Sequence, residues 1–395
     1  MTLTQPKFPF IKFDPTIASV YSMNCDKPLI SPTTLDRNSS NLSHCDREIA
    51  ALQKQGFPHG LTKILTENKD EFSLRIWVVD NSDSMRISDG RTIVENSNKS
   101  GGFELSSCSR WSEIRQTVEY HCDMAHLLQA PTIFRLLNNP ESLNIPQTSS
   151  IGENRANDIN DELYSALRAI KSVSPSGATP LSEHIREIRE QIVSLTPTLR
   201  RNETQVAIVL ATDGLPSDKN GRSDDSAWKE FAEELCGLKG LPVRVIIRLC
   251  TEEDSVVTFY KNLNIKMKLG LGMQVLDDFY QEAKEVYNHN PWLNYALPLH
   301  RFREMGYHNQ LFAALDKRRL ELDEIREFFI ILFGSERINN IPNPKSNWKK
   351  FVKSLPSIMQ QEKEHWNPVT KQLSPWVDIE ILDIGYKKKW TCMPC

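Results

Sequence analysis

The stretch that decides the fold reads Arg75-Ile76-Trp77-Val78-Val79-Asp80-Asn81-Ser82-Asp83-Ser84-Met85. Its first half is mostly apolar and shows no strict alternation, which is typical of a strand covered on both faces of a parallel sheet. The strand ends in a carboxylate, and hydroxyls follow at alternate positions, so Asp80, Ser82 and Ser84 form an Asp-x-Ser-x-Ser pattern. Hard oxygen ligands of this kind suit a small divalent cation, and ligands usually bind at the carboxyl end of a strand in an open α/β sheet.

Two later segments offer further ligands. Near Gly177, which permits a tight backbone, Pro180 suits the first position of a helix, so Thr179 would present its hydroxyl from a loop that enters a helix. A second buried strand runs through Val206-Ala207-Ile208-Val209-Leu210-Ala211-Thr212 and ends in the carboxylate of Asp213. We therefore predict one cation site, with Mg²⁺ expected and Mn²⁺ or Ca²⁺ as alternatives, built from Asp80, Ser82, Ser84, Thr179 and Asp213.

Strand-like and helix-like segments alternate along the middle of the chain. Strands are predicted at 73–80, 132–138, 204–212, 242–250 and 272–276. Apolar residues spaced by three and four positions predict helices from Trp111 onward, over 159–170 and over 228–238. This alternation predicts an α/β fold with a doubly wound, mainly parallel sheet flanked by helices.

The ends of the chain differ from this middle part. Residues 1–45 are rich in Pro, Ser, Asn and Thr, and we predict that they are disordered. The sheet domain is predicted to span 46–290, with short helices at 46–55 and 61–67 and an insertion at 86–110 that forms a hairpin excursion. Residues 291–395 are predicted to form a mainly helical extension, with helices at 311–322 and 324–333 and a looser, Trp- and Pro-rich basic tail.

Composition narrows the class of protein. The chain has 395 residues, of which 39% are hydrophobic and 25% charged, as expected of a folded soluble protein. A net charge of only −3 argues against nucleic-acid binding. The N-terminus lacks the form of a signal peptide, no apolar run reaches the length of a membrane span, and eight cysteines form no regular framework. A cytoplasmic protein with reduced thiols is the prediction.

The three ligand segments together resemble those of the von Willebrand factor A (vWA) domain with its metal-ion-dependent adhesion site (MIDAS), over residues 70–290. In that family an Asp-x-Ser-x-Ser loop, a distant Thr and a later Asp surround one divalent ion, and a partner's carboxylate can complete the octahedron. The resemblance implies a non-catalytic protein-interaction module whose partner offers an acidic group. This chain departs from the family at Asp83, where Gly is usual, and in the insertion at 86–110.

Other interpretations of the same residues remain open. The hydroxyls of Ser82, Ser84 and Thr179 could simply cap helices. An EF-hand is rejected because the sixth position from Asp80 is Met85 and the twelfth is Arg91. A phosphotransferase or phosphatase using Asp80 as nucleophile would need a second acid where this chain has a serine. A metal-independent assembly scaffold is the third possibility.

Three segments contain a cysteine in a context that could suggest metal, thiol or lipid chemistry. The pairs His44-Cys45 and His121-Cys122 lack the spacing of zinc ligands and are interpreted as ordinary packing or surface residues. Near the C-terminus a basic run, Lys387-Lys388-Lys389, precedes Cys392, which lies fourth from the end as prenylation requires, although Pro394 and Cys395 fit that signal poorly. Membrane association is therefore expected only if Cys392 is lipidated. The Cys392–Cys395 spacing could instead serve metal or disulfide chemistry.

Overall fold

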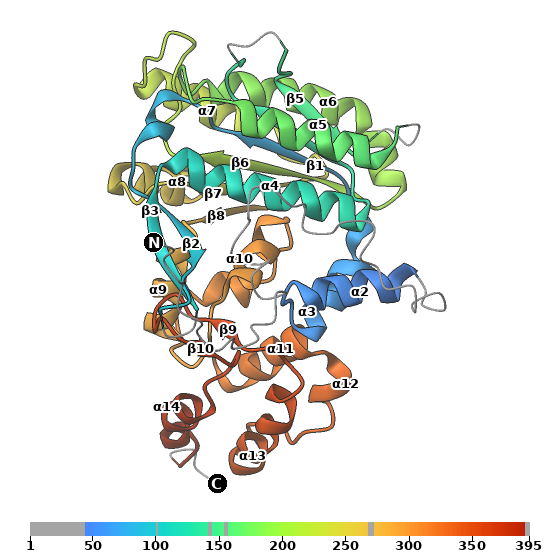
Figure 1. The fold of residues 1–395 in the computed structure, drawn as a ribbon, viewed down its shortest axis with the longest axis vertical. Coiled ribbons are helices and arrows are strands. Elements are labelled where there is room, and N and C mark those ends of the chain that lie inside the picture. The colour runs from blue at the N-terminus through green and yellow to red at the C-terminus, as the bar shows by residue number, and fades with distance from the viewer. Residues whose placement is uncertain (1–43, 100–101, 141–143, 154–156, 268–271, 392–395) are drawn as a thin grey trace, which may run out of the picture.

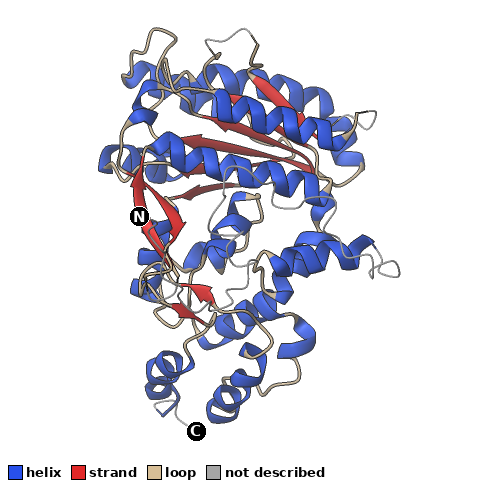
Figure 2. Ribbon diagram, viewed as in Figure 1, coloured by secondary structure: helices blue, strands red, loops and turns tan. Residues whose placement is uncertain are grey.

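The computed structural model describes residues 44–99, 102–140, 144–153, 157–267 and 272–391. A six-stranded sheet lies in the upper half of the view in Figure 2. Its strands are arranged in the order β5-β4-β1-β6-β7-β8. The strands of this sheet are β1 (Phe72–Val79), β4 (Thr132–Leu136), β5 (Thr148–Ile151), β6 (Gln205–Thr212), β7 (Val243–Leu249) and β8 (Met273–Leu276). All neighbours pair in parallel except β4 and β5, which are antiparallel.

Helices cover both faces of the sheet. Their bounds are α4 (Arg110–Leu128), α5 (Ile159–Ser172), α6 (Leu181–Arg201), α7 (Asp225–Cys236), α8 (Asp254–Met267), α9 (Phe279–His289) and α10 (Leu297–Glu304). Figure 1 shows α6 and α7 on one side of the sheet, and α4 and α10 on the other. Counting only the strands of this sheet, the order along the sheet is 3-2-1-4-5-6, so the winding reverses between β1 and β6.

The core has two apolar layers because successive side chains of a strand point to opposite faces. On β1, Ile76 and Val78 pack with the apolar faces of α6, α7 and α8, whereas Trp77 and Val79 pack toward α4 and α10. The strands are buried on both sides, which explains why they read as nearly continuous apolar runs in the sequence. The predicted α/β class, the mainly parallel sheet and its flanking helices are therefore confirmed.

The predicted strands all appear, within a few residues of the predicted bounds. The sequence pattern missed β5, an edge strand of four residues reading Thr-Ser-Ser-Ile with a single buried side chain. A strand this short and polar carries no apolar signal. Pro180 was expected at the first helical position, but it lies just before α6, at the N-cap.

The insertion forms the predicted hairpin from β2 (Gly90–Glu95) and β3 (Phe103–Cys108), which pair antiparallel. Gly90 is the first residue of β2. Gly90 has a packing reason to be glycine, because a Cβ there would lie 2.9 Å from the carbonyl oxygen of Ser109 at the start of α4. The base of the hairpin is thereby held against that helix.

Helices dominate the remaining described segments, as predicted. They are α2 (His44–Lys54), α3 (His59–Glu67), α11 (Leu322–Phe333), α12 (Ser335–Ile338), α13 (Trp348–Met359) and α14 (Ile379–Thr391), with the small ladder β9 (His365–Trp366) and β10 (Leu373–Ser374). The predicted helix at 311–322 is wrong: apart from the short 3₁₀ turn η4 (Phe312–Ala314), that stretch consists of turns. The predicted disordered segment lies outside the described residues except for its last two positions.

The tail is tightly packed where we expected a looser segment. Trp348, Trp366 and Trp376 are all buried, and they belong to the same apolar cluster as Val286 of α9 and Phe302 of α10. Apolar contacts thus continue across residue 290, so the predicted domain boundary there stays a prediction. Within the described residues, no helix is long and apolar enough to cross a membrane. The tail cysteines Cys392 and Cys395 lie outside those residues.

Candidate metal centre

The two predicted carboxylates stand at neighbouring strand ends, where the winding of the sheet reverses. Asp80 follows β1 and Asp213 follows β6. The last pair between these two strands is Val79 of β1 with Ala211 of β6. The amide of Asp80 still donates to the carbonyl of Ala211 at 2.9 Å, so the first carboxylate leaves the sheet in a fixed direction. Ligands of open α/β sheets bind at such a reversal.

The side chain of Asp80 is fully buried and accepts two hydrogen bonds. The amide of Ser82 donates to Oδ1 at 2.9 Å, and the hydroxyl of Thr212 donates to Oδ2 at 2.6 Å. The first bond folds the loop back on the carboxylate, and the second joins the ends of β1 and β6. Asp80 is thus held in place by both strands that frame the site.

The serine hydroxyls connect the two carboxylates. Ser84 Oγ donates to Asp213 Oδ1 at 2.9 Å, and the hydroxyls of Ser82 and Ser84 lie 3.1 Å apart. Because Ser84 gives its proton to Asp213, the hydrogen bond between the two serines must come from Ser82. Ser82 is the N-cap residue of the 3₁₀ turn η3 (Asp83–Arg86), but its side chain makes no cap hydrogen bond there.

Thr179 reaches the site from a loop that is fastened to both strand ends. The carbonyl of Gly177, whose φ is +94°, accepts from the amide of Asp83 at 3.1 Å. Thr179 exchanges two hydrogen bonds with Ser217, each of 2.9 Å. A methyl group added at Gly214 would lie 3.5 Å from Thr179 Oγ1 and 4.0 Å from Ser84 Oγ, so these hydroxyls flank the same small space.

The environment of both carboxylates disfavours their charged forms, so the pKa of each is raised. Burial, reinforced by the charge of Asp213, raises the pKa of Asp80 to about 6. Burial also raises the pKa of Asp213, although hydrogen bonds from Arg110 and Ser84 oppose that rise. Two buried like charges with too few positive partners favour either protonation or a bound cation.

The geometry fits a small cation with oxygen ligands. In an octahedron with Mg–O distances of about 2.0–2.1 Å, neighbouring ligand oxygens lie about 2.9 Å apart, close to the 3.1 Å between the two serine hydroxyls. Ser84 directs its proton at Asp213 and accepts from Ser82, so its oxygen keeps one further lone pair. Among the described residues no group of three or more His, Cys, Asp or Glu side chains is arranged to hold a metal, so an ion here would rely on hydroxyls, water and oxygen ligands from outside.

The candidate site opens into a groove of about 710 Å³ that includes Ile87, Lys219, Glu253 and Val256 in its walls. Asp83, the departure from the vWA pattern, lies at its rim with 71% of its side chain exposed. In the described part of the chain the non-glycine residues with positive φ are Gln129, Glu203 and Lys371, so Asp83 has an ordinary backbone that does not require glycine.

Sequence reasoning missed Arg110, the first residue of α4. Its guanidinium bonds to Asp213 Oδ2 at 2.8 Å and to both oxygens of Asp89, at 2.6 and 2.7 Å. A signal was present in the sequence. A positive charge in the first turn of a helix interacts unfavourably with the helix dipole, so an acidic partner is expected nearby. The pattern of apolar residues could not say which acid it would meet.

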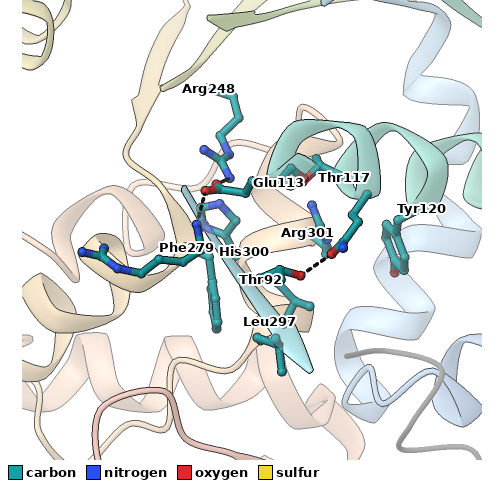
Figure 3. A pocket seen from close by; sticks show the side chains of 12 residues that line it. Thr92, Glu113, Thr117, Tyr120, Arg248, Phe279, Leu297, His300 and Arg301 are labelled. Carbon is teal, nitrogen blue, oxygen red and sulfur yellow. Dashed lines mark hydrogen bonds and ion pairs between the residues drawn. The ribbon is translucent and has the colours of Figure 1, made fainter. Parts of the chain in front are cut away.

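A second polar cluster lies between the hairpin, α4 and α10, around a cavity of about 50 Å³ (Figure 3). Figure 3 shows Glu113 between Arg248 and His300. Arg248 bonds to Glu113 at 2.6 Å and to Glu304 at 3.1 Å, and Arg301 bonds to Glu304 at 2.8 Å. Each of these arginines already has an acidic partner, and we interpret the cluster as structural.

His121, which the sequence assigned to packing or the surface, belongs to this cluster. Its Nε2 lies 3.0 Å from Glu304, and its ring packs on Trp77 with centroids 4.5 Å apart. Cys122 is buried beside it as a free thiol, and Cys45 is exposed. Neither pair therefore contributes to a metal site in the described residues.

Comparisons with known proteins identify no family. No family model matches the chain, and no curated protein matches it. The PilB minor pilin from Streptococcus sanguinis and a point mutant of it align with 62% of this chain at 14% identity, with TM-scores of 0.34 and 0.36. The chain spans 60% and 62% of those pilin chains, under two thirds of their length. Similarity at this level carries no argument, so function has to be inferred from the geometry.

Proposed function

We propose that this protein is an intracellular vWA-type interaction module, non-catalytic, that binds one divalent cation and uses it to capture an acidic group of a partner protein. Mg²⁺ is the expected ion. The observation that carries the proposal is the pair of buried carboxylates at adjacent strand ends. The amide of Ser82 bonds to Asp80, the hydroxyl of Ser84 bonds to Asp213, and the two serine hydroxyls lie 3.1 Å apart. The sheet order 3-2-1-4-5-6 with its antiparallel edge strand supports the vWA assignment.

The ligand chemistry explains how such a site would capture an acid. Hydroxyls add no charge, so two aspartates at most neutralise a divalent ion, and Arg110 already engages one of them. An ion with few protein ligands keeps exchangeable water positions, which a carboxylate from another molecule can take. The groove in front of the site provides the room.

The geometry gives less support to a phosphotransferase. A nucleophilic carboxylate has to contact its substrate, but Asp80 is fully buried and both of its oxygens accept hydrogen bonds from Ser82 and Thr212. No second acid stands two positions later, where the general acid of such enzymes is found.

The proposal is tested first by the cation alone. We expect Mg²⁺ or Mn²⁺ titrated into the purified chain to give a saturable heat signal by calorimetry, lost in Asp80→Ala and Asp213→Ala. Asp161→Ala, which removes an exposed carboxylate from the first turn of α5, is the matched control and should bind as the wild type does. No cation binding to folded wild-type protein would sink the metal-site proposal.

A second experiment tests capture. Proteins retained from a cell lysate in Mg²⁺ should be released by EDTA, and should not be retained by Asp80→Ala. Retention that ignores both EDTA and the substitution would instead support the metal-independent scaffold. Phosphate-ester hydrolysis that disappears in Asp80→Asn would support the enzyme.

A further inference from the structure

The guanidinium of Arg110 is buried between two carboxylates that belong to different parts of the chain. Only 5% of its side chain is exposed. One side meets Asp213 of the candidate metal centre, and the other forms a two-pronged pair with Asp89, which precedes the hairpin. The side chain of Asp89 is 48% exposed, so the guanidinium of Arg110 has one buried partner and one that faces solvent.

The backbone fixes the guanidinium in this position. The amide of Arg110 donates to the carbonyl of Ile87 at 2.9 Å, and the hydroxyl of Ser109 caps the helix by accepting from Ser112. The close approach of Gly90 to Ser109 holds the hairpin base against the same turn. The backbone of Arg110 is therefore held at the start of α4, and the bonds to Asp213 and Asp89 hold the guanidinium itself.

We propose that Arg110 is a built-in counter-ion that competes with the divalent cation for Asp213 and thereby sets the affinity of the site, while Asp89 moderates that competition by drawing the guanidinium outward. The inference rests on the proposed function. A positive charge bonded to one ligand oxygen repels an incoming Mg²⁺ and reduces the negative charge that the ion meets. Asp89 shares the same guanidinium, so losing Asp89 would leave its full charge to Asp213.

This arrangement predicts changes of opposite sign. Arg110→Gln removes the competing charge while keeping a hydrogen-bond donor, and should tighten Mg²⁺ binding about tenfold or more. Asp89→Asn should weaken it, by about threefold or more. Arg110→Lys retains the charge and should stay near the wild type. In the Arg110→Gln background, Asp89→Asn should have little further effect, because Asp89 acts through Arg110.

The experiment is calorimetric titration of Mg²⁺ into each folded variant, with circular dichroism to confirm folding. Arg318→Gln, which breaks an exposed arginine pair with Glu324 at the start of α11, is the control for removing an arginine elsewhere. A purely structural role for Arg110 would weaken or leave unchanged the binding in Arg110→Gln, and that result overturns the proposal. Should Arg110→Gln fail to fold, weaker binding in Asp89→Asn and wild-type-like binding in Arg110→Lys still support it, and any other pattern contradicts it.

Failure of this inference can be told apart from failure of the metal-site proposal. If wild type binds Mg²⁺ and Arg110→Gln binds it no more tightly, only the role of Arg110 is wrong. If no folded variant binds Mg²⁺, both are wrong. Binding by Arg110→Gln but not by wild type would support the role of Arg110 and contradict the proposed function, because the counter-ion would then block the wild-type site.

Discussion

Two groups of buried carboxylates in this molecule differ in how their negative charge is compensated. Glu304 on α10 is fully buried and meets Arg248 at 3.1 Å, Arg301 at 2.8 Å and His121 at 3.0 Å. Burial acts to raise the pKa of Glu304, but its neighbours hold that pKa well below its ordinary value, and among them Arg301 has the largest effect. At the strand ends, burial instead raises the pKa of Asp80 to about 6.

The difference shows what each group is suited to do. Around Glu304, two arginines and the ring of His121 compensate the carboxylate within the chain, and these contacts cross-link α4, β7 and α10. At the strand ends, Asp80 and Asp213 accept hydrogen bonds from hydroxyls. Arg110, which bonds to Asp213, is also paired with Asp89, so positive charge is lacking there. The first arrangement links elements of the fold, and the second is the arrangement at which we propose that a cation binds.

The largest effect is expected from Glu304→Gln. Neutralising this acid leaves Arg248 and Arg301 buried with less compensation, and should lower the free energy of unfolding by about 3–5 kcal/mol. Urea denaturation measures the loss. Glu327→Gln, on an exposed position of α11, is the control and should change stability little. A loss under about 1 kcal/mol in Glu304→Gln would show that the cluster is not the cross-link inferred here.

Cation binding should act on the other group alone. Mg²⁺ at a hundred times its dissociation constant should raise the free energy of unfolding by about 2.7 kcal/mol, measured by urea denaturation with Mg²⁺ and with EDTA. Asp213→Ala should abolish this gain. Glu304→Gln should retain it, because its substitution touches a different set of charges. Loss of the Mg²⁺ effect in Glu304→Gln would mean that the two groups are coupled.

Without cation, Asp80→Asn should stabilise the protein at neutral pH. The pKa of Asp80 is raised to about 6 in the folded state, so its favourable contribution is complete below the unfolded pKa and is lost as pH rises through about 6. Removing that charge should gain about 1–2 kcal/mol near pH 7 and flatten the pH dependence of stability between pH 4 and 7. A metal-free Asp80→Asn protein that is less stable than the wild type at pH 7 would contradict this account.

The smallest effect is expected at the rim. Asp83→Gly removes an exposed charge and places glycine where φ is ordinary, so Mg²⁺ affinity should weaken by about threefold or less. The freed backbone should cost about 0.5–1 kcal/mol of stability. Calorimetry and denaturation measure the two effects, with Asp83→Asn separating charge from backbone. A tenfold change in affinity would make Asp83 part of the site itself.

The strands and the carboxylates at their ends were predictable because their signals are local. Apolar runs mark β1 and β6, and the carboxylates that end them must meet where neighbouring parallel strands end. The pairs that decide the electrostatics could not be read this way. Arg110 and Asp213 are 103 positions apart, and no periodicity connects them. The buried tryptophans of the tail were missed for the same reason, since short irregular segments conceal what they pack against.

The sequence by itself determined the α/β class, the buried strands and the oxygen-rich ends of β1 and β6, because apolar period and residue type act over a few neighbouring positions. Tertiary structure alone decided which charges are compensated. Among the described residues it brought two arginines to Glu304, but to Asp213 a single arginine, which Asp89 shares. Charge compensation depends on distances between residues far apart in the chain, and only folding sets those distances.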